Sequence, residues 1–440
     1  MTDRNHWKGT RIAMIGLGPH GEMVEDAKFL IKAGALLSVY DMKSEARLKS
    51  HLVYLRSIGL ANYVCGQIPA DDLLDADIVI LSHEYPRDST FLARVREKGT
   101  PIEYPETLFF KLAPPLTVVG IIGAAGKTSI ISVLAPMLEL ASEKDDVAST
   151  GQNFFVCDPE SNNGIICHLK KAKNGDILLI RITPRLIDEL HELRVSPHVA
   201  IFAALPERYV KSPFEILEHQ TYNNFLIASD EVIDTTRTHD WKPRAKMLRT
   251  KVTIIPPFWD LNIHEHNRMN IALALQVAHL FKVEDEQVKK IVETWKPPKG
   301  RIEFVKKQKG IEFYNDTASI LPQSTISAMM ALSKDRNLVL ICGGSDTGVS
   351  YSELINVVPE YAHTVILLPG SGTMKHRKLF EAIPNTKVIS APGMEEAVRL
   401  ARENAKVGDR VLFSPAFEAS GYDISRKDRG ERFVRAVRGL

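Results

Sequence analysis

The sequence has little cysteine and almost no net charge. Its 440 residues include 4 cysteines, and no two of them form a C-x-x-C pair. A disulfide framework and a cysteine zinc site are therefore not expected, whereas a reducing compartment is. The 56 basic and 54 acidic residues leave a formal net charge of +2. That balance gives no reason to expect nucleic acid or a membrane surface as the main partner.

The sequence also lacks long apolar runs, fixed-period repeats and low-complexity tracts. No stretch reaches the roughly 18 apolar residues that a membrane-spanning helix needs, and the first residues have no apolar core of a signal peptide. We therefore expect a cytoplasmic protein. A composition of 44% hydrophobic and 25% charged residues is typical of a globular protein, and the length predicts roughly two or three domains.

The stretch from Thr117 to Ser129 is the most informative part of the sequence. An apolar run typical of a buried strand ends in a glycine-rich turn with Gly123 and Gly126, and Lys127 and Thr128 then open a helical pattern. In such a turn, backbone N–H groups close around phosphate oxygens, while the helix N-terminus and the lysine add positive charge. The threonine hydroxyl can ligate the magnesium that accompanies a nucleotide.

The spacing of this loop differs from the usual one. Gly120 precedes Gly126 by six residues, one more than in G-x-x-x-x-G-K-S/T. The alternative interpretation is a glycine-rich turn followed by a surface lysine. Because strand, glycines, Lys-Thr and helix occur in the order that a phosphate loop requires, the sequence favours binding of ATP or GTP.

The first segment has the pattern of a βαβ unit. An expected strand at 11–15 precedes Gly16, Gly18 and Gly21 in G-x-G-x-x-G spacing, a helix follows at 23–33, and a strand at 37–40 ends at Asp41. A tight turn, a helix start and an acid are the parts of a Rossmann-type nucleotide site. A bound dinucleotide is the less favoured interpretation, since such folds also hold other nucleotides or nothing.

Strands and helices alternate through the rest of the chain. A strand at 78–82 ends at Ser82, where a ligand can lie at the carboxyl edge of a sheet. Further strands are expected at 177–180, 199–202, 338–341, 365–368 and 411–413, and helices at 214–228 and 266–280. This alternation predicts three α/β domains. They are an N-terminal Rossmann-like domain at 1–112, a central P-loop ATPase-like domain with a parallel sheet at 113–299, and a C-terminal Rossmann-like domain at 300–440.

The order of these parts resembles the Mur ligase family. The resemblance covers essentially the whole chain, and within the family it is strongest to the members that add D-glutamate. The motifs that carry it are the Rossmann-like segment, the loop G-x-x-G-x-x-G-K-T-S, His266–Asn267, R-I-E-F from Arg301, Asn315–Asp316, and S-P-A from Ser414 with Arg429–Gly430 downstream.

The resemblance implies an ATP-driven amide ligase. The family reaction would add an amino acid, D-glutamate by resemblance, to UDP-N-acetylmuramoyl-L-alanine through an acyl phosphate, in peptidoglycan precursor synthesis for the cell wall. It implies ATP and Mg²⁺ as cofactors, small-molecule substrates and a monomer. Such a reaction needs in-line positioning and cations that hold the developing negative charge, and little covalent help from the protein.

The resemblance also assigns roles by position. ATP binding falls to Gly123, Gly126, Lys127, Thr128, Ser129, Asn267, Arg301 and Asp316. Within this set, Lys127 would hold the β- and γ-phosphates, Thr128 the magnesium and Asn267 the adenine, while Arg301 and Asp316 would close the C-terminal domain over the nucleotide. The uridine-nucleotide end would be lined by Gly16, Gly18, Asp41 and Ser82. Ser414 would help to hold the amino-acid carboxylate.

Simpler interpretations exist for several of these residues. Asp316 can cap a turn, and Asn267 can cap a helix start. Arg301 can be a solvated linker residue, and Asp41 can be an acid that forms a turn without a ligand.

The chain departs from the family pattern around the expected second magnesium. Arg181 stands where the family has a glutamate ligand, and Arg208 lies in the segment that should supply a histidine. Asn223 is our best placement for a lysine that the family carbamylates. The two lysines expected at the amino-acid carboxylates are replaced by Ala318 and Thr347.

Arginine cannot ligate magnesium, but it can partly replace a metal because both stabilise phosphate charge. One hypothesis is therefore an active ligase with one magnesium at Thr128, in which Lys127, Thr128, Arg181 and Arg208 serve catalysis. A second is a nucleotide-binding homologue whose ligase activity is lost or altered. A third, ranked last, is a dinucleotide-dependent oxidoreductase that uses Gly16, Gly18 and Gly21.

Overall fold

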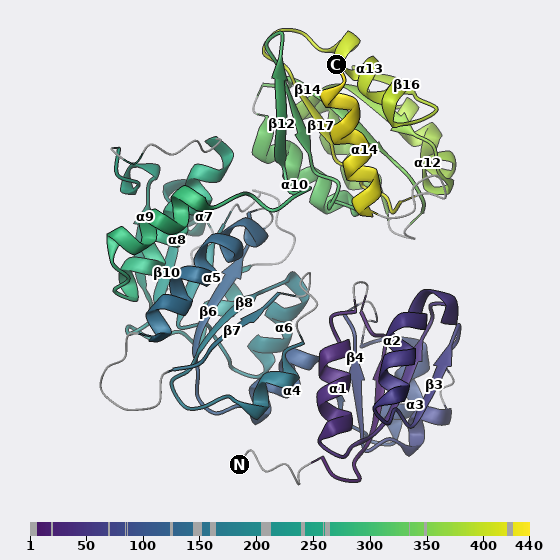
Figure 1. Ribbon diagram of the computed structural model, residues 1–440, viewed down its shortest axis with the longest axis vertical. Coiled ribbons are helices and arrows are strands. Elements are labelled where there is room, and N and C mark those ends of the chain that lie inside the picture. Colours follow the sequence, from purple (N-terminus) through teal and green to yellow (C-terminus); the bar gives the residue numbers. More distant parts are fainter. Residues whose placement is uncertain are drawn as a thin grey trace.

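The structure is a computed structural model. It describes residues 7–18, 21–68, 71–83, 85, 87–123, 126–143, 152–158, 164–203, 213–238, 243–257, 259, 265–333, 335–346, 350–419 and 426–440. In this part of the chain the strands form three separate sheets, and helices cover the faces of each (Figure 1).

The first sheet is parallel and has the strand order β3-β2-β1-β4-β5. Register pairs Ile15, the last residue of β1, with Tyr40 of β2 and Leu81 of β4. The carboxyl ends of these three strands therefore meet at one edge. The elements are β1 Arg11–Ile15, α1 Val24–Lys32, β2 Leu36–Asp41, α2 Glu45–Ser57, β3 Asn62–Cys65, η1 Asp71–Asp75, β4 Ile78–Leu81, η2 Thr90–Leu92, α3 Ala93–Glu97, β5 Ile102–Glu103 and α4 Pro105–Leu112.

The second sheet is also parallel, with the order β11-β10-β9-β6-β8-β7. Its strands are β6 Thr117–Ile122, β7 Phe154–Cys157, β8 Ile177–Arg181, β9 Val199–Phe202, β10 Phe225–Ser229 and β11 Lys246–Thr250. Its helices are α5 Lys127–Glu143, η3 Ile166–Lys170, α6 Pro184–Glu192, η4 Pro213–Leu217, α7 Asp230–Thr238, η5 Val252–Ile254, α8 Glu265–Leu280 and α9 Asp285–Thr294.

The third sheet has the order β12-β13-β17-β14-β15-β16, and only the hairpin β12–β13 is antiparallel among the described pairs. Its strands are β12 Glu303–Gln308, β13 Ile311–Asn315, β14 Leu338–Gly343, β15 Ala362–Leu368, β16 Lys387–Ser390 and β17 Arg410–Phe413. Its helices are α10 Pro322–Leu332, α11 Ser352–Tyr361, α12 Ser371–Glu381, α13 Met394–Asn404 and α14 Arg426–Arg438.

The strands of the third sheet are buried on both faces. Side chains of a strand point alternately to opposite faces, so Leu338 and Leu340 of β14 pack in the core with α10 and α11, whereas Val339 and Ile341 pack in the core with α13 and α14. Runs that are apolar at every position follow from this two-sided burial. The three-domain α/β fold class predicted from the sequence is confirmed.

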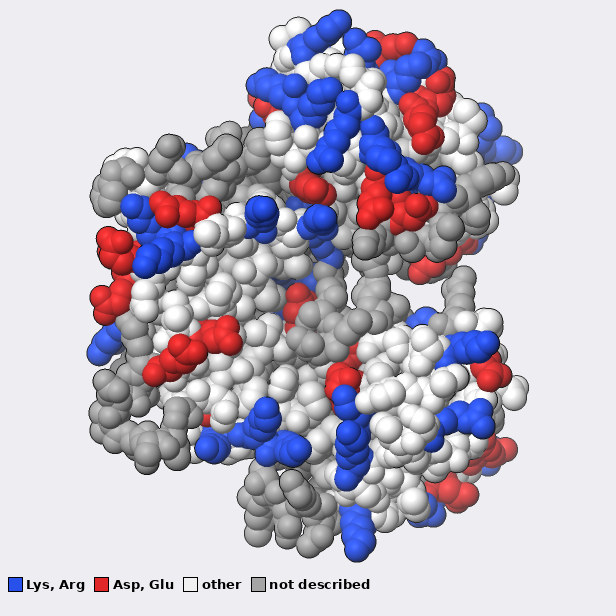
Figure 2. All heavy atoms as spheres, viewed as in Figure 1, with Lys and Arg blue, Asp and Glu red and all other residues white. Residues whose placement is uncertain are grey.

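The N-terminal and C-terminal domains both adjoin the central domain (Figure 1). Helix α4, which the expected limit at residue 112 assigns to the first domain, contacts η3 and α6 of the central one. One hydrophobic core runs through both, and it includes Phe109 of α4 and Leu178 of β8. Basic and acidic side chains are interspersed on the visible face (Figure 2). No described helix is both apolar enough and long enough to cross a bilayer.

The prediction of a helix at 214–228 is wrong. The chain forms the short helix η4, a turn, and then strand β10. In that turn, Asn224 Oδ1 accepts the backbone N–H of Thr221 at 2.7 Å. A short apolar run has no periodicity that separates a buried strand from a buried helix. The turn lies at the amino end of β10, because Phe225 pairs with Val199, the first residue of β9. Asn223 is thus at the edge of the sheet opposite the loop after β6, and its placement near the phosphate site is also wrong.

Candidate nucleotide site between the central and C-terminal domains

The turn after β6 has the backbone of a phosphate loop. Gly123 and Gly126 have φ of +136° and +86°, a backbone region that residues with a Cβ rarely adopt. A Cβ on Gly126 would lie 2.5 Å from Asn270 Oδ1 of α8. Helix α5 begins at Lys127, so its unpaired N–H groups and positive end face the turn.

Lys127 is a buried cation at the start of this helix. Its side chain is 9% exposed, and its Nζ donates a hydrogen bond to the carbonyl oxygen of Gly123 at 2.5 Å. Burial, and after it the charges of Arg181 and Arg301, lower the pKa of Lys127 to about 7, against an opposing effect of Asp158. Lys127, Arg181 and Arg301 thus gather around one space, and cations gathered in this way favour the binding of polyphosphate.

Arg181 brings its guanidinium to the same place from the neighbouring strand. It ends β8 and is paired in register with Ile121 of β6. Its Nη1 lies 3.4 Å from Thr128 Oγ1 and 3.3 Å from Asp158 Oδ1. Asp158 follows β7, so its carboxylate and the guanidinium both project from the carboxyl edge of the central sheet, where ligands of such sheets bind.

A cavity of about 430 Å³ opens in front of these residues and is walled on its other side by the C-terminal domain. Its lining includes residues predicted from the sequence to bind ATP, namely Gly126, Lys127, Thr128, Ser129, Asn267, Arg301 and Asp316. Asn267 lies within the first turn of α8 and is 2% exposed, which is not the position of a helix cap. Asn270 Nδ2 donates to its Oδ1 at 3.3 Å.

The C-terminal wall is organised around Asp316. Its Oδ1 accepts the backbone N–H of Ile302 at 3.2 Å, and its Oδ2 accepts the hydroxyl of Ser414 at 2.7 Å. Burial raises the pKa of Asp316 to about 6, although Ser319, Ser414 and Arg301 act in the opposite direction. Asp316 therefore ties the connection between the domains to the carboxyl end of β17, which is more than the turn cap of the simpler interpretation.

Two features beside Asp316 follow from this network. Ser414 is fully buried and also lies 2.8 Å from Thr325 Oγ1, so its hydroxyl is bound inside the domain. Ile302, directly after Arg301, has φ of +47°, an unfavourable backbone conformation for a β-branched residue. Arg301 lines the cavity and is not a solvated linker residue.

The residues present fit one magnesium ion better than two. Thr128 offers a hydroxyl oxygen, the kind of ligand that magnesium takes together with phosphate oxygens and water. Among the described residues no group of three or more His, Cys, Asp or Glu could hold a metal ion, and the position next to Thr128 carries the positive charge of Arg181. Arg208, and with it Glu207 and Thr347, lies outside the described residues.

The residues expected at the uridine-nucleotide end lie together at the carboxyl edge of the N-terminal sheet. Gly16 and Gly18 have φ of +79° and +84°. Asp41 is fully buried, and its carboxylate accepts the N–H groups of Leu17 at 3.1 Å and Lys43 at 2.8 Å. Hydrogen bonds of this kind agree with the simpler interpretation, in which Asp41 stabilises a turn. Ser82 is 1% exposed and follows β4.

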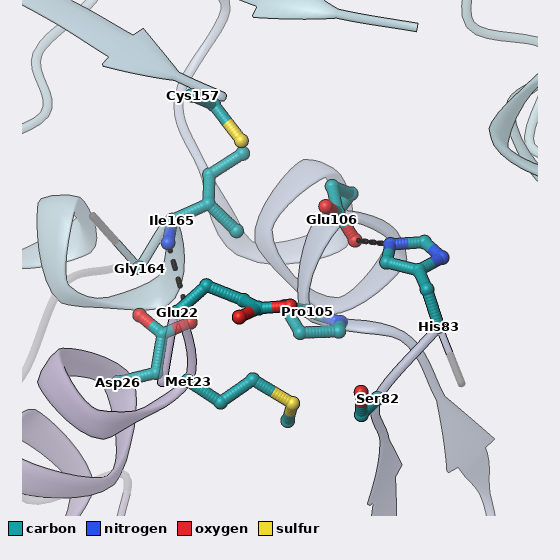
Figure 3. Close-up of a pocket in the computed structure, with 10 residues that line it drawn as sticks. All are labelled: Glu22, Met23, Asp26, Ser82, His83, Pro105, Glu106, Cys157, Gly164 and Ile165. Carbon is teal, nitrogen blue, oxygen red and sulfur yellow. Dashed lines mark hydrogen bonds and ion pairs between the residues drawn. The ribbon is translucent and has the colours of Figure 1, made fainter. Parts of the chain in front are cut away.

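A polar seam joins this edge to the central domain (Figure 3). Asp26 of α1 accepts the N–H groups of Ile165 at 3.2 Å and Cys167 at 2.9 Å, and so caps the start of η3. Burial raises the pKa of Asp26 to about 7. Beside it, His83 Nε2 and Glu106 Oε2 are 2.8 Å apart, and the charge of Glu106 contributes to raising the pKa of His83 despite burial.

Asp158, Asn270 and Asp26 were not predicted from the sequence as residues of these sites. Asp158 could have been found, because it directly follows an apolar run that forms a strand, as Ser82 does. Asn270 shares a helix face with Asn267. Nothing in the local sequence around Asp26 indicates that it caps an element of another domain.

Comparison with known proteins agrees with this architecture. Residues 300–417 match the family of Mur ligase, glutamate ligase domains. The UDP-N-acetylmuramoylalanine–D-glutamate ligases of Clostridioides difficile strain 630 and Koribacter versatilis strain Ellin345 are 28% and 26% identical to the chain. The first alignment covers 98% of this chain and 99% of the relative, and the second covers 98% of each.

Solved structures share the fold at lower identity. A murein peptide ligase from Psychrobacter arcticus superposes with a TM-score of 0.55 at 14% identity, covering 98% of this chain and 99% of that one. The UDP-N-acetylmuramate–alanine ligase of Thermotoga maritima gives 0.52 at 14% identity, with the same coverage. In its fold, in its C-terminal domain and in sequence along its whole length, the chain is therefore similar to the Mur ligases.

Proposed function

We propose that this chain is an ATP-dependent ligase that joins D-glutamate to UDP-N-acetylmuramoyl-L-alanine in the synthesis of peptidoglycan precursors. The observation that carries the proposal is the cavity in which Lys127, Thr128 and Arg181 face Arg301 and Asp316. Relatives named for this reaction align with 98% of the chain. The described residues of the phosphate loop are of the types that bind a nucleotide. Because these relatives are named as ligases, the hypothesis of an oxidoreductase is the least favoured of the three.

The proposed reaction has two steps. A carboxylate oxygen of the alanyl group attacks the γ-phosphorus of ATP, so that an acyl phosphate forms and ADP leaves. The amine of the amino acid then attacks the acyl carbon, the amide bond forms, phosphate leaves, and the amine releases a proton. Lys127 holds the oxygens between the β- and γ-phosphates, and Arg301 and Asp316 close the site from the other domain. Magnesium, when held by Thr128, supplies further charge neutralisation across the phosphates.

In this proposal Arg181 provides positive charge where the resemblance to the family implies an acidic metal ligand. The guanidinium lies within hydrogen-bonding reach of Thr128, and its N–H donors are of the kind that bind phosphate oxygens. A fixed cation in a site that excludes water stabilises the charge that develops on a transferred phosphoryl group. The choice of D-glutamate rests on similarity alone, because Ala318 offers no cation to an amino-acid carboxylate.

A second candidate is a family member that binds nucleotide without ligation. It is favoured by the missing set of metal ligands among the described residues. Phosphate release by the purified protein, with ATP, UDP-N-acetylmuramoyl-L-alanine and D-glutamate over a range of magnesium concentrations, separates the two. Release that depends on all three substrates and disappears in Lys127→Ala supports the ligase. ATP binding that Lys127→Ala abolishes, without release for any amino acid tried, supports the second candidate.

A further inference from the structure

Arg185 connects the ligand edges of two sheets. It lies in the first turn of α6, which begins three residues after β8 ends at Arg181. Its Nη1 donates a hydrogen bond at 2.7 Å to the backbone carbonyl oxygen of His83, which lies just beyond the end of β4 in the N-terminal domain. The guanidinium therefore lies between the carboxyl edge of the N-terminal sheet and the carboxyl edge of the central sheet.

A second arginine, Arg87, lies beside the same tyrosine ring as Arg185, but it has carboxylate partners. The guanidinium carbons of Arg87 and Arg185 lie 5.2 and 6.0 Å from the centre of the Tyr104 ring, and Tyr104 is 1% exposed. Arg87 forms ion pairs with Glu189 at 3.2 Å and Glu103 at 3.8 Å. For Arg185, the described residues provide the carbonyl of His83 and no carboxylate within ion-pair distance.

This difference has a physical consequence. A guanidinium has five N–H donors, and Arg185 is only partly exposed. A partly desolvated arginine without a counter-ion is costly unless an anion completes its hydrogen bonds. Glu106, the acid next to His83, is already engaged with the His83 ring at 2.8 Å. The unmatched charge is at the seam between the domains and not at the outer surface.

We propose that Arg185 binds an anionic group of the uridine-nucleotide substrate, through phosphate or carboxylate oxygens. This rests on the proposed function. A substrate whose nucleotide lies at the edge formed by Gly16 and Ser82, and whose carboxylate reaches the phosphate loop at Thr128, has to cross the seam where Arg185 lies. Bidentate recognition of phosphate or carboxylate is what a guanidinium does best. Arg185 then sets where the substrate carboxylate lies along the path to ATP.

The test compares Arg185→Gln with Arg87→Gln, which removes an arginine from the same tyrosine ring but one that already has carboxylate partners. Binding of UDP, UDP-N-acetylmuramate and UDP-N-acetylmuramoyl-L-alanine is measured by calorimetry, beside KM and kcat. We expect Arg185→Gln to weaken binding of the complete substrate by about 10- to 100-fold, with the KM for ATP unchanged. Arg87→Gln should leave these affinities within about twofold of wild type, and Arg185→Lys should retain part of the affinity.

The three ligands identify the anion. An equal loss for UDP and for the complete substrate assigns the diphosphate, whereas a loss confined to ligands with a carboxylate assigns that group. Unchanged affinity for all three ligands in Arg185→Gln, in an enzyme that turns over normally, overturns the proposal alone. Wild-type protein that binds none of the uridine nucleotides and releases no phosphate overturns the proposed function instead. Thermal unfolding of each variant shows whether the fold is kept.

Discussion

Arg181 and Thr128 are hydrogen-bonded across the phosphate site, with Arg181 Nη1 3.4 Å from Thr128 Oγ1. If this guanidinium supplies the charge of a second metal, Arg181→Ala should lower kcat by roughly 10²- to 10³-fold, the usual effect of removing a group that stabilises transition-state charge. The affinity for ATP should change much less, because Lys127 and the helix N-terminus remain. Phosphate-release kinetics and direct ATP binding measure the two effects separately.

Arg399→Ala on the exposed face of α13 is the matched control for that experiment, since it removes an arginine far from the cavity. Wild-type activity should saturate with magnesium as for one bound ion, and Arg181→Glu should change the magnesium dependence. An Arg181→Ala enzyme with the kcat of wild type would refute the role given to this side chain.

Replacing Gly126 by alanine should abolish ATP binding. The new Cβ would meet Asn270 Oδ1 at 2.5 Å, and φ of +86° is strained for alanine. Gly175→Ala provides a control with nearly the same backbone, φ of +87°, but its Cβ would have no neighbour nearer than 3.9 Å. The control should lose about 1 kcal/mol of stability and keep its affinity for ATP. Equal ATP affinities in the two variants, measured by calorimetry, would contradict the close approach of α8 to the loop.

Ser414→Ala should affect the domain connection and ATP use together. Without the hydroxyl, the buried carboxylate of Asp316 loses the donor at 2.7 Å, and the pKa of Asp316 should rise further above its usual range. Loss of a partner from a buried polar group costs about 1–3 kcal/mol, so the free energy of unfolding should fall by that amount and the KM for ATP should rise. Ser390→Ala, at the exposed end of β16, should change neither. A stable Ser414→Ala variant with an unchanged KM for ATP would show that Asp316 does not depend on this bond.

Asp26 should make stability depend on pH. The folded-state pKa of about 7 is above the ordinary value of 3.8, so the folded protein holds a proton that the unfolded chain has lost. Its contribution is fully present below about pH 4 and is lost as pH rises to about 7. The slope attributable to this one proton is at most ~1.4 kcal/mol per pH unit. Urea unfolding at several pH values measures it.

Asp26→Asn should remove that component of the pH dependence, while Asp72→Asn on the exposed helix η1 should retain it. Glu106, Cys157 and Cys167 are the neighbouring groups whose charges affect Asp26 or respond to it. Parallel curves for wild type and Asp26→Asn would show that the pKa of Asp26 is the same in the folded protein as in the unfolded chain.

Much of the fold could be predicted because local patterns determine it. The strand, the glycines at 123 and 126 and the helix from Lys127 lie next to one another in the sequence, and so do the parts of the first βαβ unit. The stretch at 214–228 could not be predicted in this way, since its apolar residues are buried in a sheet whose neighbouring strand, β9, ends more than twenty residues earlier.

The site divides along the same line. Lys127, which lines the cavity from its own loop, could be predicted as a site residue from spacing, whereas contacts between domains could not. The bond between Arg185 and His83 joins residues 102 positions apart, and that between Asp26 and Cys167 joins residues 141 positions apart. Such pairs depend on how folded domains pack against each other. The periodicity of a single sequence does not indicate this packing. The resemblance to the family supplied the role of Asp316, but not its bonds to Ile302 and Ser414.

The left-handed backbone conformation of Ile302 lies in the segment that joins the second and third domains, so its φ angle affects how these two domains are oriented. A β-branched residue in this region relaxes if φ changes, and the hydrogen bond from its N–H to Asp316 helps to hold the backbone next to the cavity. A change of φ at Ile302 would turn the C-terminal domain relative to the central one. Small molecules that wedge beside Ile302, and so prevent this change of φ, would be an approach to inhibition that leaves the ATP-binding surface untouched.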